Sequence, residues 1–213
     1  MDFGHSKLSL YAMKFTKKYQ KVIYESHLPQ LGCKNIDQLM LSFYADQFEK
    51  ASPNMDLSVM ESKKAVLKLL EGIEKQRKVL SGNLEYDFNI DCLLEDNDFS
   101  YTMKREQFEE ISKPALEKIS LFFNEFNTKL TELGVDVSHI ELIGGGSRIP
   151  CFIKLVSDSF KIEPSRTLNS SECIARGAAL CSAMQSRIFR VKEYFTFDVN
   201  FNGLVCSWKG EGE

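Results

Sequence analysis

The chain has 213 residues, of which 43% are hydrophobic and 27% are charged, and its formal net charge is −3. A chain of this length and composition can bury the core of one domain, with room for a subdomain insert. The weak negative charge and the lack of any lysine- or arginine-rich block exclude a nucleic-acid partner that is bound through phosphate neutralisation. No apolar run in the sequence is long enough to span a bilayer.

The cysteines are scattered, with no C-x-x-C pair and no Cys/His cluster. This pattern favours free thiols in an intracellular protein over a disulfide framework or a zinc site, and it predicts a cytoplasmic location. The opening Met-Asp-Phe-Gly resembles the end of a buried strand, and the tail Lys-Gly-Glu-Gly-Glu resembles a linker. We therefore expect the chain to be an excised fragment.

The first quarter of the chain predicts a β-hairpin followed by a helix. Residues 7–15 and 19–27 alternate apolar and polar side chains on either side of a Thr-Lys-Lys turn. Asn35 is expected to cap a helix whose apolar residues recur at helical spacing as far as Phe48.

The middle of the chain predicts a second helix and a second pair of strands. Residues 58–80 place apolar side chains at helical spacing, and Gly82 with Asn83 is expected to end that helix. Residues 85–92 and 99–103 alternate as two strands joined by an acidic turn.

The next segment predicts a long helix, a short strand and another helix. The helix is expected over residues 105–130, with a kink or a break at Pro114. An apolar strand over residues 139–143 runs directly into three glycines, and Ile149-Pro150 is expected to open the following helix.

The last segment predicts one more helix and an extended tail. Asn169 and Glu172 form a capping-box pattern for a helix that reaches Ser186. We expect its small residues to let it pack close to a sheet: Ala175, Gly177, Ala178 and Ala179. Residues 191–200 are extended and aromatic in pattern, and the mixture of helices and strands indicates an α/β or α+β fold.

The first segment with chemical potential is Asp2-Phe3-Gly4-His5-Ser6, at a strand-to-turn corner. Backbone amides exposed in such a corner can hold phosphate oxygens, and an aspartate there can face a hydrated magnesium ion. The alternative is an ordinary hairpin turn.

The second segment is one stripe of the helix over residues 58–80. Glu74, Arg77, Lys78 and Ser81 fall at i, i+3, i+4 and i+7 and therefore share a face. A carboxylate can accept both ribose hydroxyl protons, a cationic side chain can lie flat on adenine, and a hydroxyl can bond the edge of the base. The alternative is a solvated, salt-bridged face.

The third segment is the strand, glycine run and helix start over residues 143–150. Glycines let the backbone approach a flat base or a phosphate closely, and a helix N-terminus favours anionic groups. Arg148 can stack on a base. A glycine-rich connection without function is the alternative.

Five motifs, in order and at compatible spacing, resemble the C-terminal lobe of the nucleotide-binding domain of the 70-kDa heat-shock chaperones. That family belongs to the actin and sugar-kinase superfamily. Residues 2–6 match its second phosphate loop, residues 74–81 resemble its E-x-x-K-[RK]-x-L-S adenine helix, and residues 144–150 match G-G-[ST]-[ST]-R-I-P. Residues 31–37 resemble its G-G-x-x-F-D entry to the outer subdomain, and residues 169–179 resemble N-x-D-E-A-x-A-x-G-A-A.

Two features resemble the large, 110-kDa branch of that family. This branch carries G-H-S where the ordinary chaperones carry G-G-G-T, as Gly4-His5-Ser6 does here. It also follows the lobe with an aromatic R-V-x-x-F segment, as residues 190–195 do. Members of the branch bind ATP, act as nucleotide-exchange factors for the smaller chaperones and hold unfolded clients.

The resemblance implies a site for ATP or ADP with Mg²⁺. The residues implied for adenosine are Glu74, Arg77, Lys78, Ser81, Gly145 and Arg148; those for the phosphates are Gly4, His5 and Gly32, with Asp2 facing magnesium through water. Four positions depart from the ordinary chaperones and imply weak hydrolysis: Cys33 replaces a glycine beside the nucleotide, Ser171 an aspartate near the ribose and base, and Lys7 and Ser9 a threonine and an aspartate near the γ-phosphate.

The implied fold is α/β, an actin-like ATPase lobe with a ribonuclease H-like sheet flanked by helices and an inserted α+β outer subdomain. The resemblance divides the chain into an inner subdomain (1–31 and 113–190), an outer subdomain (32–112), and a linker with the first client-domain strand (191–213). Rotation of the outer subdomain is expected to open and close the nucleotide cleft.

We therefore expect the ATP- and ADP-binding lobe of a large chaperone. It should have no ATPase activity of its own, because phosphoryl transfer needs groups on both sides of the phosphates. One alternative is a lobe of an ordinary ATP-hydrolysing 70-kDa-type chaperone, and another is an interaction module with a decayed nucleotide site. The implied partners are the N-terminal lobe of the same protein, a smaller chaperone and unfolded clients, with no nucleic acid and no membrane.

Overall fold

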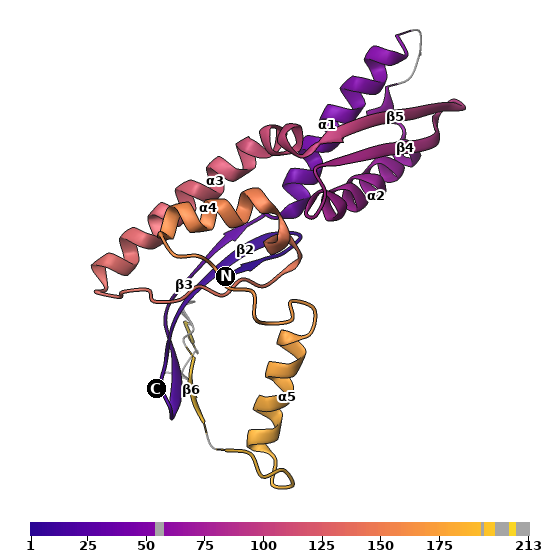
Figure 1. The fold of residues 1–213 in the computed structure, drawn as a ribbon. Coiled ribbons are helices and arrows are strands. Elements are labelled where there is room, and N and C mark those ends of the chain that lie inside the picture. The colour runs from indigo at the N-terminus through magenta and orange to yellow at the C-terminus, as the bar shows by residue number, and fades with distance from the viewer. Residues whose placement is uncertain (54–57, 193, 199–204, 208–213) are drawn as a thin grey trace, which may run out of the picture.

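A computed structural model describes residues 1–53, 58–192, 194–198 and 205–207. The described chain forms an inner part around a sheet, an outer part around a hairpin, and one helix that stands apart from both (Figure 1). Helices and strands are mixed through the chain, so the predicted α/β class is confirmed.

The inner part is built on three antiparallel strands, β1 (Asp2–Phe3), β2 (Lys7–Phe15) and β3 (Tyr19–Pro29). The predicted hairpin is confirmed, and β3 continues two residues beyond the expected end. Its alternating pattern has a structural cause, since Leu8 and Leu10 are buried against the helices while Tyr11 faces outward. A short strand, β6 (Phe195–Phe197), adds to the edge of β3 in parallel.

The segment predicted as a strand over residues 139–143 joins this sheet through isolated bridges. Ile143 pairs in parallel with Asp2, and Glu141 pairs in parallel with Ser165. Main-chain hydrogen bonds tie the segment on both sides, from Phe3 N to Ile143 O at 3.0 Å and from Leu142 N to Ser165 O at 2.9 Å. The sheet therefore runs from Ser165 through the segment before the glycines to β1, β2, β3 and β6.

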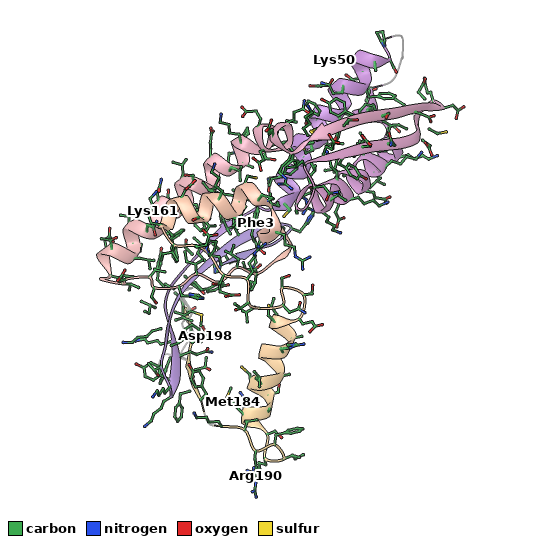
Figure 2. The ribbon with its side chains drawn as sticks, in the orientation of Figure 1. Phe3, Lys50, Lys161, Met184, Arg190 and Asp198 are labelled. Atoms are coloured by element: carbon green, nitrogen blue, oxygen red, sulfur yellow. The ribbon has the colours of Figure 1, made fainter. Side chains whose placement is uncertain are left out.

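Two helices cover one face of this sheet, α3 (Arg105–Glu132) and α4 (Pro150–Phe160) (Figure 1). Aromatic rings fill the layer between these two helices and the sheet. Phe3 stacks on Phe152 of α4 with ring centroids 4.3 Å apart, and Phe123 of α3 meets the same ring edge-on. Figure 2 shows Phe3 at the centre of this packing.

Of the kink or break predicted at Pro114, the break is absent, since α3 runs without interruption through that residue, and a kink stays a prediction. Pro114 lies on the exposed side of the helix, with the buried Ser112 and Ala115 on the other side. The carbonyl that loses its N–H partner can therefore be solvated, and the buried face still packs, so the helix continues.

The outer part consists of α1 (Cys33–Ala51), a short 3₁₀ turn η1 (Val59–Glu61), α2 (Lys63–Leu80) and the hairpin β4 (Glu85–Leu94) and β5 (Asn97–Lys104). An aromatic cluster holds it together. The buried Tyr44 of α1 stacks on Phe88 of β4 with centroids 4.2 Å apart, and Gln76 of α2 donates to its hydroxyl at 2.6 Å.

Two expected helix starts were wrong. Gly32, not Asn35, is the N-cap of α1; Asn35 is the third helical residue, and its side-chain oxygen accepts from the Gly32 N–H at 2.8 Å. The helix expected over residues 58–80 is divided, because Ser62 ends η1 and caps α2 by accepting from Ala65 N.

The helix that stands apart is α5 (Cys173–Gln185), and it buries none of its residues. The expected close packing of its small residues on a sheet is therefore wrong, and a β-carbon at Gly177 would meet no atom within 4 Å. Asn169 does not cap α5; its side chain accepts from Ser171 N, and the helix begins four residues later. Met184 and Arg190 lie away from the sheet (Figure 2).

None of the described helices combines the length and apolar character of a membrane span. The extended segment predicted over residues 191–200 is described in part, and β6 lies within it. Residues 193, 199 and 200 lie outside the described residues.

Candidate functional site

The two glycine-containing turns of the inner part lie against each other and against the start of α1. Gly4 N–H closes the first turn on Lys7 O at 3.1 Å, and Gly4 O accepts from Cys33 N at 3.1 Å. Gly144, with φ of +89°, lies so close to Asp2 that a β-carbon there would be 2.5 Å from the Asp2 carboxylate. The structure thus brings Asp2, Gly4 and the glycine run together.

Gly32 also lies against the turn between β1 and β2, at a distance that leaves no room for a side chain. A β-carbon on Gly32 would lie 2.4 Å from His5 O and 2.7 Å from Ser6 N. The start of α1 also bonds the turn directly, with Lys34 N donating to His5 O at 2.9 Å. All four residues predicted for phosphates and magnesium therefore lie together.

The turn between β1 and β2 presents two main-chain donors. Among the described residues, the N–H groups of His5 and Ser6 have no hydrogen-bond partner, and both residues are exposed. The first N–H groups of α1 are already bonded to main-chain carbonyls of Gly4 and His5. An anion at this place would therefore bind the turn rather than the helix N-terminus.

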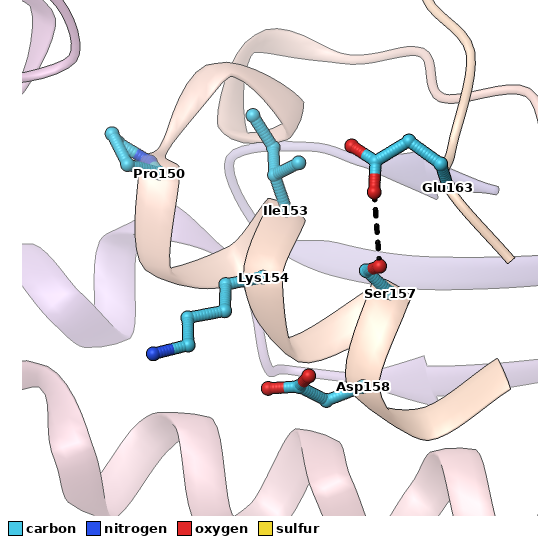
Figure 3. A pocket seen from close by; sticks show the side chains of 6 residues that line it. All are labelled: Pro150, Ile153, Lys154, Ser157, Asp158 and Glu163. Carbon is cyan, nitrogen blue, oxygen red and sulfur yellow. Dashed lines mark hydrogen bonds between the residues drawn. The ribbon is translucent and has the colours of Figure 1, made fainter. Parts of the chain in front are cut away.

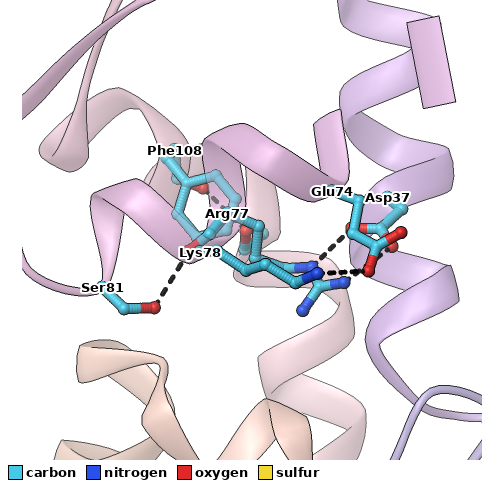
Figure 4. A network of polar contacts seen from close by, with 7 residues as sticks. Asp37, Glu74, Arg77, Lys78, Ser81 and Phe108 are labelled. Atoms are coloured by element: carbon cyan, nitrogen blue, oxygen red, sulfur yellow. Dashed lines mark hydrogen bonds and ion pairs between the residues drawn. The ribbon is translucent and has the colours of Figure 1, made fainter. Parts of the chain in front are cut away.

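The four residues predicted to share one helical face, of which three lie on α2 and Ser81 directly follows it, do not share one environment (Figure 4). Arg77 turns inward, where its Nε and Nη2 donate to the Asp37 carboxylate of α1 at 2.8 and 3.3 Å. Glu74 and Lys78 remain on the surface as an exposed ion pair at 2.7 Å. Ser81 donates its hydroxyl proton to Arg77 O at 2.9 Å.

The Asp37–Arg77 pair is nearly inaccessible, with residue exposures of 5% and 7%. Burial raises the pKa of Asp37, and the hydrogen bond and positive charge of Arg77 oppose that rise. The pair is bidentate and fixes α1 against α2 at the base of the outer part.

A pocket of about 630 Å³ lies between the C-terminal end of α2 and the glycine-containing turn over residues 144–148. Ser81 and Arg148 of the predicted adenosine residues line it, whereas Glu74, Arg77, Lys78 and Gly145 do not. The rest of its lining is Gly82, Leu142, Ser147, Arg166, Leu168, Asn169 and Ser170. Arg148 lies in the 3₁₀ turn η2 (Gly145–Arg148), and its Nη2 donates to Ser170 Oγ at 3.2 Å.

A second pocket, of about 340 Å³, lies along α4 (Figure 3). Pro150, Ile153, Lys154 and Asp158 line it, together with Ser157, which donates to the Glu163 carboxylate at 3.0 Å. None of the residues predicted for nucleotide binding lines this pocket.

The chain matches the family model for the Hsp70 protein over residues 1–211. The chain belongs to the Hsp70 family. It is 34% identical over 213 residues to heat shock 70 kDa protein 14 of Arabidopsis thaliana, covering 99% of this chain and 25% of that protein. It is 31% identical to heat shock 70 kDa protein 4L of Homo sapiens, covering 100% of this chain and 26% of that protein.

Another relative, the 97 kDa heat shock protein of Mesocentrotus franciscanus, is 31% identical over 215 residues, which is 24% of its length. The resemblance to the large branch of the Hsp70 family is thereby confirmed. The chain spans about a quarter of the length of these curated relatives.

Cys33 fills the space between the two turns of this Hsp70-family chain. Its sulfur would lie 2.6 Å from a β-carbon placed on Gly146. Burial raises the pKa of Cys33 to about 11, so the thiol is protonated and uncharged at neutral pH. Its contribution here is packing, and it brings no negative charge to the turn between β1 and β2.

The sequence did not reveal the loop over residues 166–170 as part of the pocket. That loop follows Ser165, whose parallel bridge to Glu141 places it at the same end of the sheet as the glycine run. The signals nearby were the Asn169 to Glu172 motif, which we interpreted as a helix cap, and the resemblance that implied a position near the ribose and base for Ser171, and neither pointed to Arg166. A one-residue bridge leaves no hydrophobic pattern, so the position of Arg166 was not predictable.

Among the described residues, no group of three or more His, Cys, Asp or Glu side chains is arranged to hold a metal ion. Asp2 is the carboxylate that lies against the glycine turns. A single carboxylate suits a magnesium ion whose other ligands are water and phosphate oxygens.

Proposed function

We propose that this chain is an ATP- and ADP-binding lobe of a large Hsp70-family chaperone. The observation that supports this most directly is the pocket shared by Ser81 and Arg148, with the phosphate turn of Asp2, Gly4 and His5 nearby. A base would occupy the pocket, and the phosphates would take the free N–H groups of His5 and Ser6. Magnesium, when bound with the nucleotide, would supply charge neutralisation at the phosphates, and Asp2 would orient its water ligands.

The sheet order supports an actin-like, ribonuclease H-like lobe. Three antiparallel strands are followed across the sheet by two parallel connections, at Asp2 with Ile143 and Glu141 with Ser165. We place the inner subdomain at residues 1–31 and 113–190, the outer subdomain at 32–112, and the linker from residue 191. Within this proposal α5 packs against the N-terminal lobe of the same protein, because its apolar residues Ile174 and Leu180 are exposed in the described structure and would be buried by that contact.

In the whole protein, we propose a nucleotide-exchange factor and holdase that acts in the cytoplasm with smaller chaperones and unfolded clients. The support is the similarity to large heat shock proteins. An ordinary ATP-hydrolysing member is disfavoured by Gly4-His5-Ser6.

A second candidate is an interaction module that has lost nucleotide binding. The Asp37–Arg77 pair favours this second candidate, because the buried Arg77 guanidinium is bonded to Asp37 and is therefore not free to contact adenosine. Glu74 and Lys78 remain on the surface, paired with each other and outside the lining of the pocket.

Titration of the isotope-labelled chain with ADP, with and without Mg²⁺, separates the two candidates. We expect backbone amide shifts at residues 78–82, 144–148 and 166–170, with further shifts at His5 and Ser6. Shifts of His5 and Ser6 that require the diphosphate and are absent with adenosine would support the phosphate turn. An unchanged spectrum at millimolar ADP would reject nucleotide binding by this chain and favour the interaction module.

A further inference from the structure

The loop after Ser165 brings an additional cation into the pocket. Arg166 lines it together with Ser81 and Arg148, and no acidic residue is among the lining residues. Within the described part of the chain, the Arg166 guanidinium has neither an ion pair nor a hydrogen bond, and Arg148 bonds only a neutral hydroxyl. Two guanidinium groups without a carboxylate favour an anionic or an electron-rich ligand.

The main chain on both sides of Arg166 is fixed. Ser165 bonds in both directions, accepting from Leu142 N at 2.9 Å and donating to Ile140 O at 2.7 Å. The Glu141 carboxylate accepts from the Thr167 hydroxyl at 3.1 Å and from Leu168 N at 2.8 Å. A ligand would therefore order the Arg166 side chain alone, which keeps the entropy cost of binding small.

The pocket offers a ligand one hydrogen-bond acceptor, at Ser81, and a donor, at Arg166. Ser81 gives its proton to Arg77 O, so its oxygen can only accept from a ligand. The Arg166 guanidinium can only donate. An acceptor and a donor in one pocket match an amino group beside a ring nitrogen, as on adenine, and oppose the carbonyl oxygen that hypoxanthine carries at the same position.

We propose that Arg166 is a base-recognising residue, whose guanidinium donates to N1 or N7, the ring nitrogens on either side of the amino group, of the adenine held between Ser81 and Arg148. This inference rests on the proposed function, because it assigns a further contact to the same nucleotide. Leu168, which is 50% exposed, supplies apolar surface for the base, and about 630 Å³ is within the range of small-molecule pockets.

The test is binding of adenosine, which lacks phosphates, followed by amide shifts in the parent chain, Arg166→Ala and Arg176→Ala. Arg176 is a matched control, since it is an exposed arginine of α5 that pairs with Glu172 outside the pocket. Loss of a hydrogen bond from a charged donor should weaken adenosine binding by about tenfold or more in Arg166→Ala, with no change in Arg176→Ala. Arg166→Gln, which keeps a donor without the charge, should lie between the parent and Arg166→Ala.

Ligand analogues identify the contact. With 1-deazaadenosine or 7-deazaadenosine, each lacking one ring nitrogen, the penalty of Arg166→Ala should disappear for the analogue that lacks the contacted atom. A penalty that persists with both analogues would overturn the inference.

The remaining outcomes separate the inference from the proposed function. Adenosine binding by the parent with no effect of Arg166→Ala would overturn the role of Arg166 and leave the nucleotide site standing. A penalty for ADP without one for adenosine would mean that Arg166 contacts phosphate, which also overturns it. No adenosine or ADP binding by the parent would reject the proposed function, and the inference with it.

Discussion

At Gly32, helix α1 begins within contact distance of the backbone of the turn that follows β1. A β-carbon there would lie 2.4 Å from His5 O and 2.6 Å from His5 C, and backbone atoms cannot move aside as a flexible side chain does. We expect Gly32→Ala to lower the free energy of unfolding by about 1–3 kcal/mol, measured by urea denaturation. Gly145→Ala is the matched control, because a β-carbon at Gly145 meets nothing within 4 Å. Equal stability of the two variants would contradict the close approach.

The Asp37–Arg77 pair gives a prediction about pH. Arg77→Met leaves a buried carboxylate without its partner and should cost about 3–5 kcal/mol. Because burial already raises the pKa of Asp37 and Arg77 opposes that rise, the variant should raise it further. A carboxyl whose pKa is higher in the folded state binds its proton more tightly there, so stability is highest at low pH. It falls as the pH rises from about 4 through the folded-state pKa.

The measurement for Arg77→Met is the free energy of unfolding between pH 4 and 7, relative to the parent. Lys78→Met is the control, since it breaks the exposed pair with Glu74 and should cost less than about 1 kcal/mol. Adding Asp37→Asn to Arg77→Met should remove the extra pH dependence. A difference from the parent that stays constant with pH would show that the Asp37 carboxylate is not the titrating group.

At the scale of elements, the sequence predicted regular structure well and helix ends poorly. The hairpin of β2 and β3 was predictable because Leu8, Leu10 and Ala12 are buried on one face, which leaves an alternating apolar pattern in the sequence although Ser9 is buried as well. The start of α1 was not, because Asn35 reaches back to Gly32 from inside the helix instead of capping it. A capping residue and a third-position residue of the same type leave similar patterns in a sequence.

Helix α5 illustrates the difference between forming an element and packing it. The capping-box pattern of Asn169 and Glu172 led to the prediction of a helix here, which is confirmed, but the small residues of the helix do not specify which surface covers it. Hydrogen exchange can test this, because a helix of 13 residues without tertiary packing is only marginally stable in water. We expect α5 amides to exchange far faster than those of α4, which is similar in length but buries Phe152 and Val156. Comparable protection in the two helices would mean that α5 packs on something in solution.

At the scale of the whole molecule, the candidate site is assembled from segments that the sequence shows only separately. The two glycine turns were visible as motifs, but their contact depends on the parallel pairing of Asp2 with Ile143. The inward turn of Arg77 depends on Asp37, forty residues earlier and on another helix. A partner that is distant in the sequence leaves no periodic pattern. For this reason Arg77 was predicted to share an exposed face with Glu74, Lys78 and Ser81.

The proposed site also leads us to expect that the chain binds ATP without hydrolysing it. Hydrolysis of ATP requires groups that position water and neutralise charge on both sides of the γ-phosphate. The proposed site offers groups on one side, with Asp2 at the glycine turns. We therefore expect phosphate release from ATP with this chain to equal that of the buffer, and Asp2→Asn to release the same amount. Turnover above the buffer that is lost in Asp2→Asn would contradict the prediction, because the carboxylate would then act in a site that this chain completes by itself.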